Sequence, residues 1–252
     1  MTEHGRLDRG DGVDLAWART QGRSPAVVFL TGFRSDMTGD KATALAQFCE
    51  AHGQAMLRFD YSGHGTSGGT FEQGTIGAWT RDALAVIDNL THGPLVLVGS
   101  SMGGWIALLA ALARPARLSA VLGIAAAPDF TERLMWDAFT PAQRKAFLRD
   151  GVLDVPSEYG GPYAITRALI EDGRQHLLLD APIRLRCPLR LLHGQRDADV
   201  PWETALKIAA AVESTDVEVT LVKDGDHRLS RPHDLQRLIR TLEPLLESAA
   251  RD

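Results

Sequence analysis

Ser101 lies in the stretch "GSSMG", residues 99–103, which fits the pattern G-x-S-x-G in one register only. The aliphatic run "LVLV" precedes this stretch, and the apolar segment "WIALLAALA" follows it. Glycines on both sides allow a strand to turn sharply into a helix, so that the central hydroxyl is exposed at the helix N-terminus. Free backbone N–H groups and the helix dipole favour developing negative charge there. The pattern therefore predicts Ser101 as a nucleophile and Ser100 as a turn residue.

A serine hydroxyl is a weak nucleophile and needs a base, which is itself held by a carboxylate. After a serine at such a turn, the acid and then the histidine are expected later in the chain, following further strands. "LLHGQRDADVPW" offers Asp197 and Asp199, and "VKDGDHRLS" offers His227. We prefer Asp197 to Asp199 because it lies earlier in its loop, nearer the strand end. The sequence thus predicts a catalytic triad of Ser101, Asp197 and His227.

The other acids and histidines considered for these roles are interpreted as structural. Asp224 and Asp226 lie too close to His227 in the sequence to face its ring easily. His193 ends a predicted strand and His233 begins the last predicted helix. No pattern of partners surrounds the remaining candidates, which are His4, His52, His92 and His176.

Acyl transfer also requires hydrogen-bond donors for the oxyanion that forms on the substrate. We expect the backbone N–H of Met102, directly after the nucleophile, to be one donor. The other is expected to be the N–H of Phe33, in the loop "TGFRSD" that follows the run "AVVFLTG". Both are backbone groups, so their function does not depend on the side chains at these positions.

Three further features of the sequence are considered as possible binding sites: a glycine-rich motif, a set of basic residues and the spacing of metal-ligand residues. "SGHGTSG" matches G-x-G-x-x-G through Gly63, Gly65 and Gly68, but no helix follows it directly, so we expect a loop near the site. Basic residues of the segment after residue 128 are interpreted as a solvated face, with steering of an anionic substrate as the alternative; they are Arg133, Arg144, Lys145 and Arg149. No group of histidine, cysteine and acidic residues has metal-ligand spacing, so we expect no metal and no cofactor.

The elements that must position these residues alternate between strands and helices. Residues 4–20 predict a hairpin that turns at Gly10–Gly12. Buried strands are expected at 26–32, 54–61, 95–99, 118–126, 187–194 and 217–224, and helices lie between and after them. This order predicts an α/β fold with a mostly parallel, doubly wound sheet, whose ligands bind beyond the carboxyl ends of the strands.

One segment interrupts the alternation. Residues 129–182 contain helical fragments and loops but no convincing strand. We interpret them as a helical cap inserted into a single domain that spans residues 1–252. Such an insertion, placed over the strand ends, would form one wall of a pocket.

The composition limits the kinds of partner. With 27 Lys and Arg against 32 Asp and Glu, the formal net charge of the 252 residues is −5, which argues against nucleic-acid binding. The longest apolar run is too short to cross a bilayer. Cys49 and Cys187 are far apart and are expected to be buried thiols in a reducing compartment rather than a disulfide. The first residues resemble no targeting leader, so we expect a cytoplasmic protein.

Four stretches together resemble the α/β-hydrolase superfamily over nearly the whole chain, and within it the mitochondrial palmitoyl-protein thioesterases and acyl-glucuronide esterases. These stretches are "RFDYSGHGTSGG", "LVGSSMGGWIALLAALARP", "CPLRLLHGQRDADVPW" and "STDVEVTLVKDGDHRLS". The resemblance implies the α/β-hydrolase fold and a Ser101–Asp197–His227 triad. It departs in two places, since we find no transit leader and no matching motif in the cap.

The sequence therefore predicts a serine hydrolase that cleaves carboxylic thioesters and esters through an acyl-enzyme. The substrate is expected to be a small molecule or an acylated protein. A small-ester carboxylesterase or a C–C bond hydrolase is the alternative within the same fold, together with a haloperoxidase-like activity. The alternative from another class is a non-catalytic binding protein of this fold, which the presence of all three triad residues disfavours.

Overall fold

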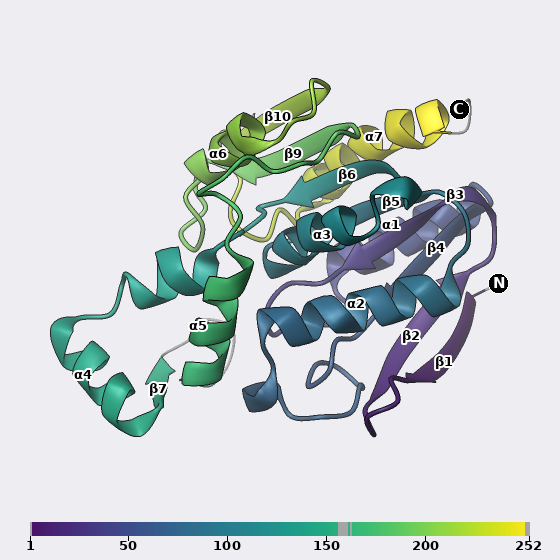
Figure 1. Cartoon of the computed structure of the whole chain (residues 1–252). Coiled ribbons are helices and arrows are strands. Elements are labelled where there is room, and N and C mark those ends of the chain that lie inside the picture. The colour runs from purple at the N-terminus through teal and green to yellow at the C-terminus, as the bar shows by residue number, and fades with distance from the viewer. Residues whose placement is uncertain (1, 156–160, 162, 250–252) are drawn as a thin grey trace.

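The computed structural model describes residues 2–155, 161 and 163–249, and its centre is one eight-stranded sheet (Figure 1). The strands follow the spatial order β1-β2-β4-β3-β5-β6-β9-β10. Their bounds are Thr2–Asp8 (β1), Asp14–Thr20 (β2), Arg23–Leu30 (β3), Gln54–Phe59 (β4), Leu95–Ser100 (β5), Leu118–Ile124 (β6), Leu189–Gly194 (β9) and Val217–Val222 (β10). Neighbours from β4 to β10 are parallel, while β1 and β2 pair antiparallel. The mostly parallel sheet predicted from the sequence is confirmed.

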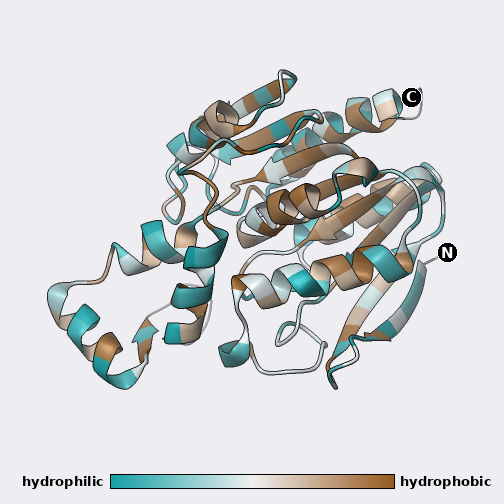
Figure 2. Ribbon diagram, in the orientation of Figure 1, coloured by the Kyte–Doolittle hydropathy of each residue, from teal (hydrophilic) through white to brown (hydrophobic). Residues whose placement is uncertain are grey.

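Helices cover both faces of this sheet. One face carries α1 (Asp40–Ala51) and α7 (Pro232–Ala249), and the other carries α2 (Ile76–Leu90), α3 (Met102–Ala113) and α6 (Glu203–Ala211). Successive side chains of β5 alternate between the two cores: Leu95 and Leu97 pack on the α2 and α3 side, and Val96 and Val98 on the α1 and α7 side. Figure 2 shows the result as continuous hydrophobic colour along β5, β6 and α3. A strand buried on both faces explains why its sequence is uniformly aliphatic.

Local signals set the bounds of several elements. The Thr75 hydroxyl accepts a hydrogen bond from the Ala78 N–H at 3.1 Å, so Thr75 caps α2. The predicted hairpin is formed by β1 and β2, and its turn contains Gly10 and Gly12 with positive φ angles. Three short 3₁₀ helices complete the connections, at Phe71–Gln73, Pro115–Arg117 and Arg174–His176.

The segment between β6 and β9 projects beyond the strand ends (Figure 1). It comprises a π-helical stretch Thr131–Trp136, then α4 (Pro141–Asp150), β7 (Val152–Val155), β8 (Tyr163–Thr166) and α5 (Arg167–Gly173). β7 and β8 pair antiparallel, so the expectation that this segment contains no strand was wrong. Strands of four residues are too short for alternation to be visible in the sequence. Residues 156–160 and 162 of the segment lie outside the described residues.

The segment has a small core of its own. Four apolar side chains form a cluster separate from those on the two faces of the sheet; they are Phe139, Phe147, Ile165 and Ile170. From here on, the cap denotes residues 129–182. Its side chains are otherwise mostly hydrophilic, as Figure 2 shows for α4.

Strained backbone is concentrated at the carboxyl edge of the sheet. Positive φ angles occur at several residues other than glycine, namely Arg34, Ser101, Ala125, Asp129 and Leu229. Each lies in the connection that follows β3, β5, β6 or β10. Such conformations cost about 1–3 kcal/mol each and persist only where surrounding contacts determine them.

Two expectations about the whole chain concern thiols and membranes. Cys49 and Cys187 are both free thiols, and Cys49 is buried. Across residues 2–249, apart from the short gap in the cap, no helix combines the length and the apolar composition that crossing a bilayer demands.

Candidate active site

Ser101 occupies the turn between β5 and α3. Its φ of 55° and ψ of −119° are the strained conformation expected of a serine at a strand-to-helix turn. The Ser101 N–H donates a hydrogen bond to the Ile124 carbonyl at 2.9 Å, which fixes the turn against β6. A Cβ atom on Gly99 would lie 2.2 Å from the Gly103 carbonyl oxygen, and one on Gly103 would lie 2.1 Å from that of Leu30. The two motif glycines therefore permit packing that any side chain would prevent.

The structure brings Ser101, His227 and Asp197 into one hydrogen-bonded chain. The Ser101 hydroxyl and Nε2 of His227 are 3.1 Å apart, and Nδ1–H of His227 donates to Oδ2 of Asp197 at 2.8 Å. The side chain of Asp197 is fully buried, while that of His227 is 18% exposed. Ser101 follows β5, Asp197 follows β9 and His227 follows β10, so three separate loops contribute to one site.

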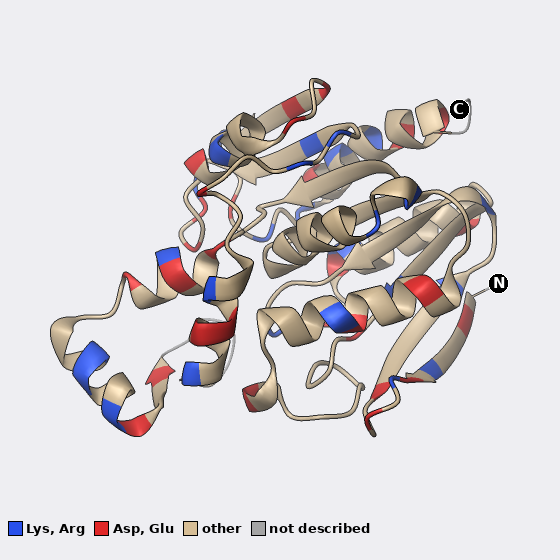
Figure 3. Cartoon of the chain, viewed as in Figure 1, with Lys and Arg blue, Asp and Glu red and all other residues tan. Residues whose placement is uncertain are grey.

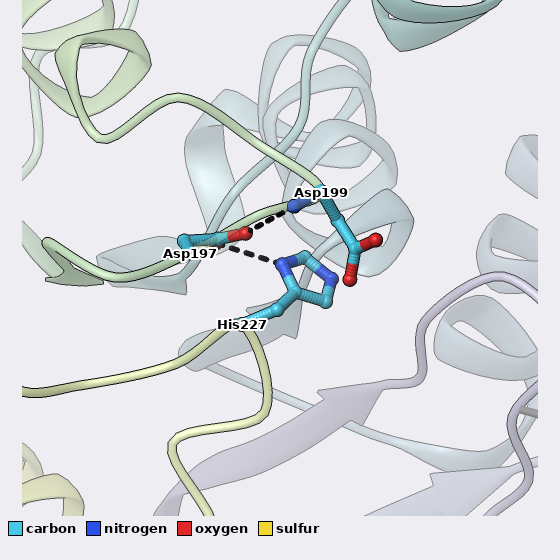
Figure 4. A group of neighbouring side chains, drawn as sticks. All are labelled: Asp197, Asp199 and His227. Carbon is cyan, nitrogen blue, oxygen red and sulfur yellow. Dashed lines mark hydrogen bonds and ion pairs between the residues drawn. The ribbon is translucent and has the colours of Figure 1, made fainter. Parts of the chain in front are cut away.

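Asp197, rather than Asp199, contacts Nδ1 of His227 (Figure 4). The second oxygen of Asp197 accepts hydrogen bonds from the backbone N–H groups of Asp199 at 2.9 Å and Val200 at 2.8 Å. The Asp199 carboxylate points away from Asp197 in the same view. A tight turn of residues 197–200 thus orients the buried carboxylate toward the imidazole.

His193 also supports Asp197, a contact that the sequence analysis missed. Its Nε2–H donates to Oδ2 of Asp197 at 3.1 Å and to the Val200 carbonyl at 3.0 Å, and its side chain is buried. Burial alone would raise the pKa of Asp197, but the hydrogen bonds from His193 and His227 bring that pKa well below its ordinary value. His193 lies near the end of β9, and Asp197 follows four residues later, after the strand. This spacing is the only sequence signal of their contact.

The two residues expected to supply oxyanion donors flank Ser101. Met102 is the first residue of α3 and is fully buried. Before Phe33, the backbone passes so close to Ser101 that a Cβ atom on Gly32 would lie 3.5 Å from the Cβ of that serine. The Phe33 ring is held among four aromatic rings at centroid distances of 4.9–5.8 Å, those of Phe71, Trp79, Phe130 and Tyr163.

A cavity of about 880 Å³ opens at Ser101 and His227. Apolar residues of its lining include several of the cap; they are Phe33, Ala127, Phe130, Leu134, Met135 and Tyr163. Charged and polar residues also line it, among them Arg34, Asp36, Asp40, Lys41, Arg228 and Ser230. A ligand that places a reactive carbonyl at Ser101 therefore meets both apolar and polar groups.

Lys41 connects α1 to the loop that carries His227. Its ammonium group donates to the Arg228 carbonyl and lies 3.4 Å from the Ser230 hydroxyl. Burial is the main cause that lowers the pKa of Lys41 to about 8. The sequence analysis gave no role to this lysine.

The basic residues noted in the cap do not gather at the cavity. Arg133 is paired with Asp129 and Asp180, the guanidinium of Arg144 lies 5.2 Å from the centroid of the Trp136 ring, and Arg149 is paired with Asp150. Figure 3 shows the basic residues of α4 at the end of the cap that lies away from the sheet. Among the residues that the structure describes, neither these arginines nor Lys145 line the cavity.

Only one group of possible metal ligands is found within the described ranges, and two of its three members, Asp197 and His227, belong to the hydrogen-bonded chain at Ser101. Single ligand atoms of Asp197, Asp199 and His227 lie within 4.8 Å of one another. The sequence shows no metal-ligand spacing for this group because its members come from two loops that are distant in the chain. Both oxygens of Asp197 already accept hydrogen bonds, and Nδ1 of His227 donates one. The group therefore has the donor pattern of a hydrogen-bonded triad rather than that of a cation cage.

Comparison with known proteins shows the family of this chain. The sequence pattern of the alpha/beta hydrolase family matches residues 27–238. The chain belongs to this family. In the α/β-hydrolase fold, a serine, an acid and a histidine follow one another along the chain, each after a strand. Ser101 after β5, Asp197 after β9 and His227 after β10 have this order. The fold class predicted from the sequence is thus confirmed.

Curated relatives of this α/β-hydrolase include the proteins named palmitoyl-protein thioesterase ABHD10, mitochondrial. Those of Pongo abelii and Homo sapiens are 43% and 42% identical over 243 residues, which are 96% of this chain and 79% of theirs. Among solved structures, alpha/beta hydrolase domain-containing protein 10 from mouse aligns with a TM-score of 0.91 at 39% identity, covering 98% of this chain and 99% of that one. A putative hydrolase from Agrobacterium vitis S4 aligns with a TM-score of 0.92 at 39% identity, covering 98% of both.

These relatives correct one expectation. The sequence analysis placed the protein in the cytoplasm, whereas the relatives that match 96% of the chain are named as mitochondrial proteins. The cytoplasmic assignment was wrong because it rested on composition and on the character of the first residues. A mixed, mildly acidic surface is shared by folded domains of many compartments and does not specify an address.

Proposed function

We propose that this α/β-hydrolase is a serine thioesterase and esterase whose triad is Ser101, His227 and Asp197. The observation that carries the proposal is the continuous hydrogen-bonded chain from the Ser101 hydroxyl through His227 to the buried Asp197. No step of this chemistry calls for a cofactor. The family and the names of the curated relatives support the same reaction class.

In the proposed reaction, Nε2 of His227 takes the hydroxyl proton as Ser101 attacks the acyl carbonyl. Asp197 holds the imidazole in the tautomer with a proton on Nδ1 and stabilises the imidazolium that forms. The N–H groups of Phe33 and Met102 donate to the oxyanion, and each such donor contributes about 2.7–4 kcal/mol of transition-state stabilisation. The leaving thiol or alcohol then departs, and water activated by His227 hydrolyses the acyl-enzyme.

We further propose a long-chain acyl thioester as the substrate, with residues 129–182 acting as a cap over the acyl site. Phe130, Leu134, Met135 and Tyr163 belong to this segment and line the cavity. An alkyl chain bound there would gain about 0.8 kcal/mol per buried methylene. The relatives named as palmitoyl-protein thioesterases act on substrates of this class.

A fluorophosphonate probe tests the nucleophile. The intact protein should become labelled at Ser101, as read by mass spectrometry of the modified peptide. Ser101→Ala should abolish labelling and hydrolysis while leaving the melting temperature within about 2 °C, because alanine removes only the hydroxyl. Absence of labelling in the unmodified protein would favour a binding protein that retains the fold without its chemistry.

Hydrolysis of thioesters from C2 to C16 tests the substrate class. If each methylene is buried, kcat/KM should rise by up to about fourfold per methylene until the cavity is filled. A maximum at C2–C4 would instead indicate a small-ester carboxylesterase. An acylated peptide and an acyl glucuronide with the same acyl chain, assayed in parallel, would separate the two leaving groups.

A further inference from the structure

His64 is a buried histidine that the proposed mechanism does not use. It belongs to "SGHGTSG", the glycine-rich stretch that resembled a nucleotide-binding motif, and only 4% of it is exposed. Aromatic rings surround it, with those of Tyr61, Phe71 and Trp79 at centroid distances of 5.7, 5.2 and 5.1 Å. A polar ring in such surroundings requires hydrogen-bond partners, and both of its nitrogens have one.

The two hydrogen bonds determine the tautomer of His64. Nδ1 lies 3.2 Å from the Ser62 carbonyl oxygen, which can only accept, so Nδ1 carries the proton. Nε2 is therefore free to accept, and the backbone N–H of Arg34 donates to it at 3.2 Å. Burial lowers the pKa of His64, which maintains this neutral form.

Arg34 lies in the turn that carries the proposed oxyanion donor. The Ser35 N–H donates to the Gly32 carbonyl at 3.1 Å, so Phe33 and Arg34 are the two central residues of a four-residue turn. Arg34 has a φ of 57°. A positive φ at the third position distinguishes a type II turn from a type I turn, and glycine or asparagine normally occupies it. Arginine there is strained, so the turn needs an external contact to keep this conformation.

We propose that His64 is a positioning residue, which accepts the Arg34 N–H and so keeps the turn Gly32–Ser35 in the conformation that presents the Phe33 N–H to the oxyanion. This inference rests on the proposed function of Ser101. Without an acceptor at Nε2, the strained turn relaxes by a flip of its central peptide toward a type I turn. The backbone at Phe33 then moves away from the nucleophile, although the rest of the loop remains in place.

Other contacts hold the far end of the loop, which restricts the effect of His64 to the turn. The Met37 N–H donates to the Asp60 carboxylate at 2.7 Å, and the guanidinium of Arg58 donates to the Met37 carbonyl at 2.7 Å. His64 itself is anchored through Ser62, whose N–H and hydroxyl both donate to the buried Asp82. A change at residue 64 should thus alter the geometry of the turn and leave the cavity wall intact.

Two variants separate the acceptor from the ring. His64→Phe keeps an aromatic ring in the aromatic cluster but removes the acceptor, whereas His64→Gln keeps an acceptor of similar reach and removes the ring. We expect His64→Phe to lower kcat about 10- to 100-fold with KM within about threefold, since displacing one oxyanion donor by about 1 Å has effects of this size. His64→Gln should retain kcat within about fivefold of the unmodified protein.

Inhibitor binding supplies a readout that a purely structural role would not change. An alkyl boronic acid, which forms a tetrahedral adduct on Ser101, should bind His64→Phe more weakly by the same factor as the loss in kcat. The carboxylate with the same alkyl chain, which fills the cavity without forming an oxyanion, should bind within about threefold. The matched control is Thr91→Ala, which removes a buried hydrogen bond to the Ile87 carbonyl at the end of α2, away from this turn, and should lower the melting temperature without this loss of kcat.

The outcomes distinguish this inference from the proposed function. If Ser101 is labelled and hydrolysis is normal, but His64→Phe keeps both kcat and boronic acid affinity, then His64 does not position the donor. Equal losses in His64→Phe and His64→Gln would assign the effect to the ring and would also overturn the inference. If His64→Phe does not fold, His64→Gln decides: retained boronic acid affinity supports the role, and a loss at unchanged melting temperature contradicts it. A protein whose Ser101 is never labelled fails at the proposed function instead.

Discussion

The carboxyl edge of the sheet and the cap are built in contrasting ways. At the edge, strained residues such as Ser101 and Leu229 are each held by neighbouring strands and loops, and the triad hydrogen bonds link β5, β9 and β10. The cap instead encloses four apolar side chains of its own and carries exposed ion pairs such as Arg149–Asp150. The proposed function thus places the chemistry on the edge of the sheet, and substrate choice on a segment that has an apolar cluster of its own.

The base of the cap is joined both to itself and to the body of the fold, where its Phe130 and Leu169 belong to the core on the α2 and α3 side of the sheet. Asp129, fully buried at the start of the cap, accepts hydrogen bonds from the N–H groups of Leu178 at 2.8 Å and Leu179 at 2.9 Å, near the end of the cap. Asp172 of α5 accepts one from the Gly77 N–H of α2 at 2.7 Å. The two ends of the cap are thus joined at its base. Damage to the cap core should therefore remain local.

Asp197→Asn should have the largest effect, because it removes the carboxylate at the buried end of the hydrogen-bonded chain. An amide can no longer accept the Nδ1–H of His227 as a carboxylate does, so the imidazole loses its preferred tautomer and its support as an imidazolium. We expect kcat to fall about 10⁴-fold with little change in KM. Single-turnover acylation by a short thioester measures this directly. A loss of less than about tenfold would show that Asp197 is not the acid.

Phe147→Ala should separate the two regions. Phe147 is 2% exposed in the cap core, and replacing it with alanine costs about 3–5 kcal/mol at a well-packed site. Because the cap core is separate from the sheet, we expect faster proteolysis within the cap and a loss of the preference for long acyl chains. Hydrolysis of a C2 thioester should remain within about threefold.

The matched control is Phe59→Ala, which removes a fully buried ring from the core of the sheet. This variant should lower the melting temperature of the whole protein, and it should reduce hydrolysis of C2 and C16 thioesters by similar factors. If Phe147→Ala and Phe59→Ala behaved alike, the cap and the sheet would unfold as one unit. The contrast drawn between them would then be incorrect.

The two regions also differ in how far the sequence predicts them. The elbow at Ser101, the strand runs and the order of Asp197 and His227 were recognisable because each is a local pattern tied to one backbone conformation. The contacts of His193 and His64 were missed, since a hydrogen bond between distant segments leaves no local pattern. The pairing of β7 with β8 was missed for a related reason: short strands at the surface are specified by their partner and not by their own composition.

Acid titration of stability should isolate the hydrogen bonds to the Asp197 carboxylate. Its pKa is lower in the folded protein than the value of about 3.9 in an unfolded chain, so the folded state binds the proton less tightly. The carboxylate therefore stabilises the fold above pH 4, and this contribution is lost as the pH falls through the folded pKa. Asp197→Asn should lower the free energy of unfolding by about 2 kcal/mol at pH 7, and the difference should shrink toward pH 2. Parallel curves at all pH values would contradict this assignment.

Lys41→Met should have the smallest effect, because it loosens the loop that carries His227 without removing a reacting group. The Lys41 ammonium donates to the Arg228 carbonyl, next to His227 and to the strained Leu229. Losing one such hydrogen bond, at about 1 kcal/mol, should lower kcat about three- to tenfold as His227 spends less time aligned with Ser101. Lys207→Met, on the exposed face of α6, provides the matched control and should leave kcat unchanged. If kcat of Lys41→Met were unchanged, the other contacts of the loop 227–230 would suffice to hold His227. Helix α1 would then contribute to the core but not to the alignment of the triad.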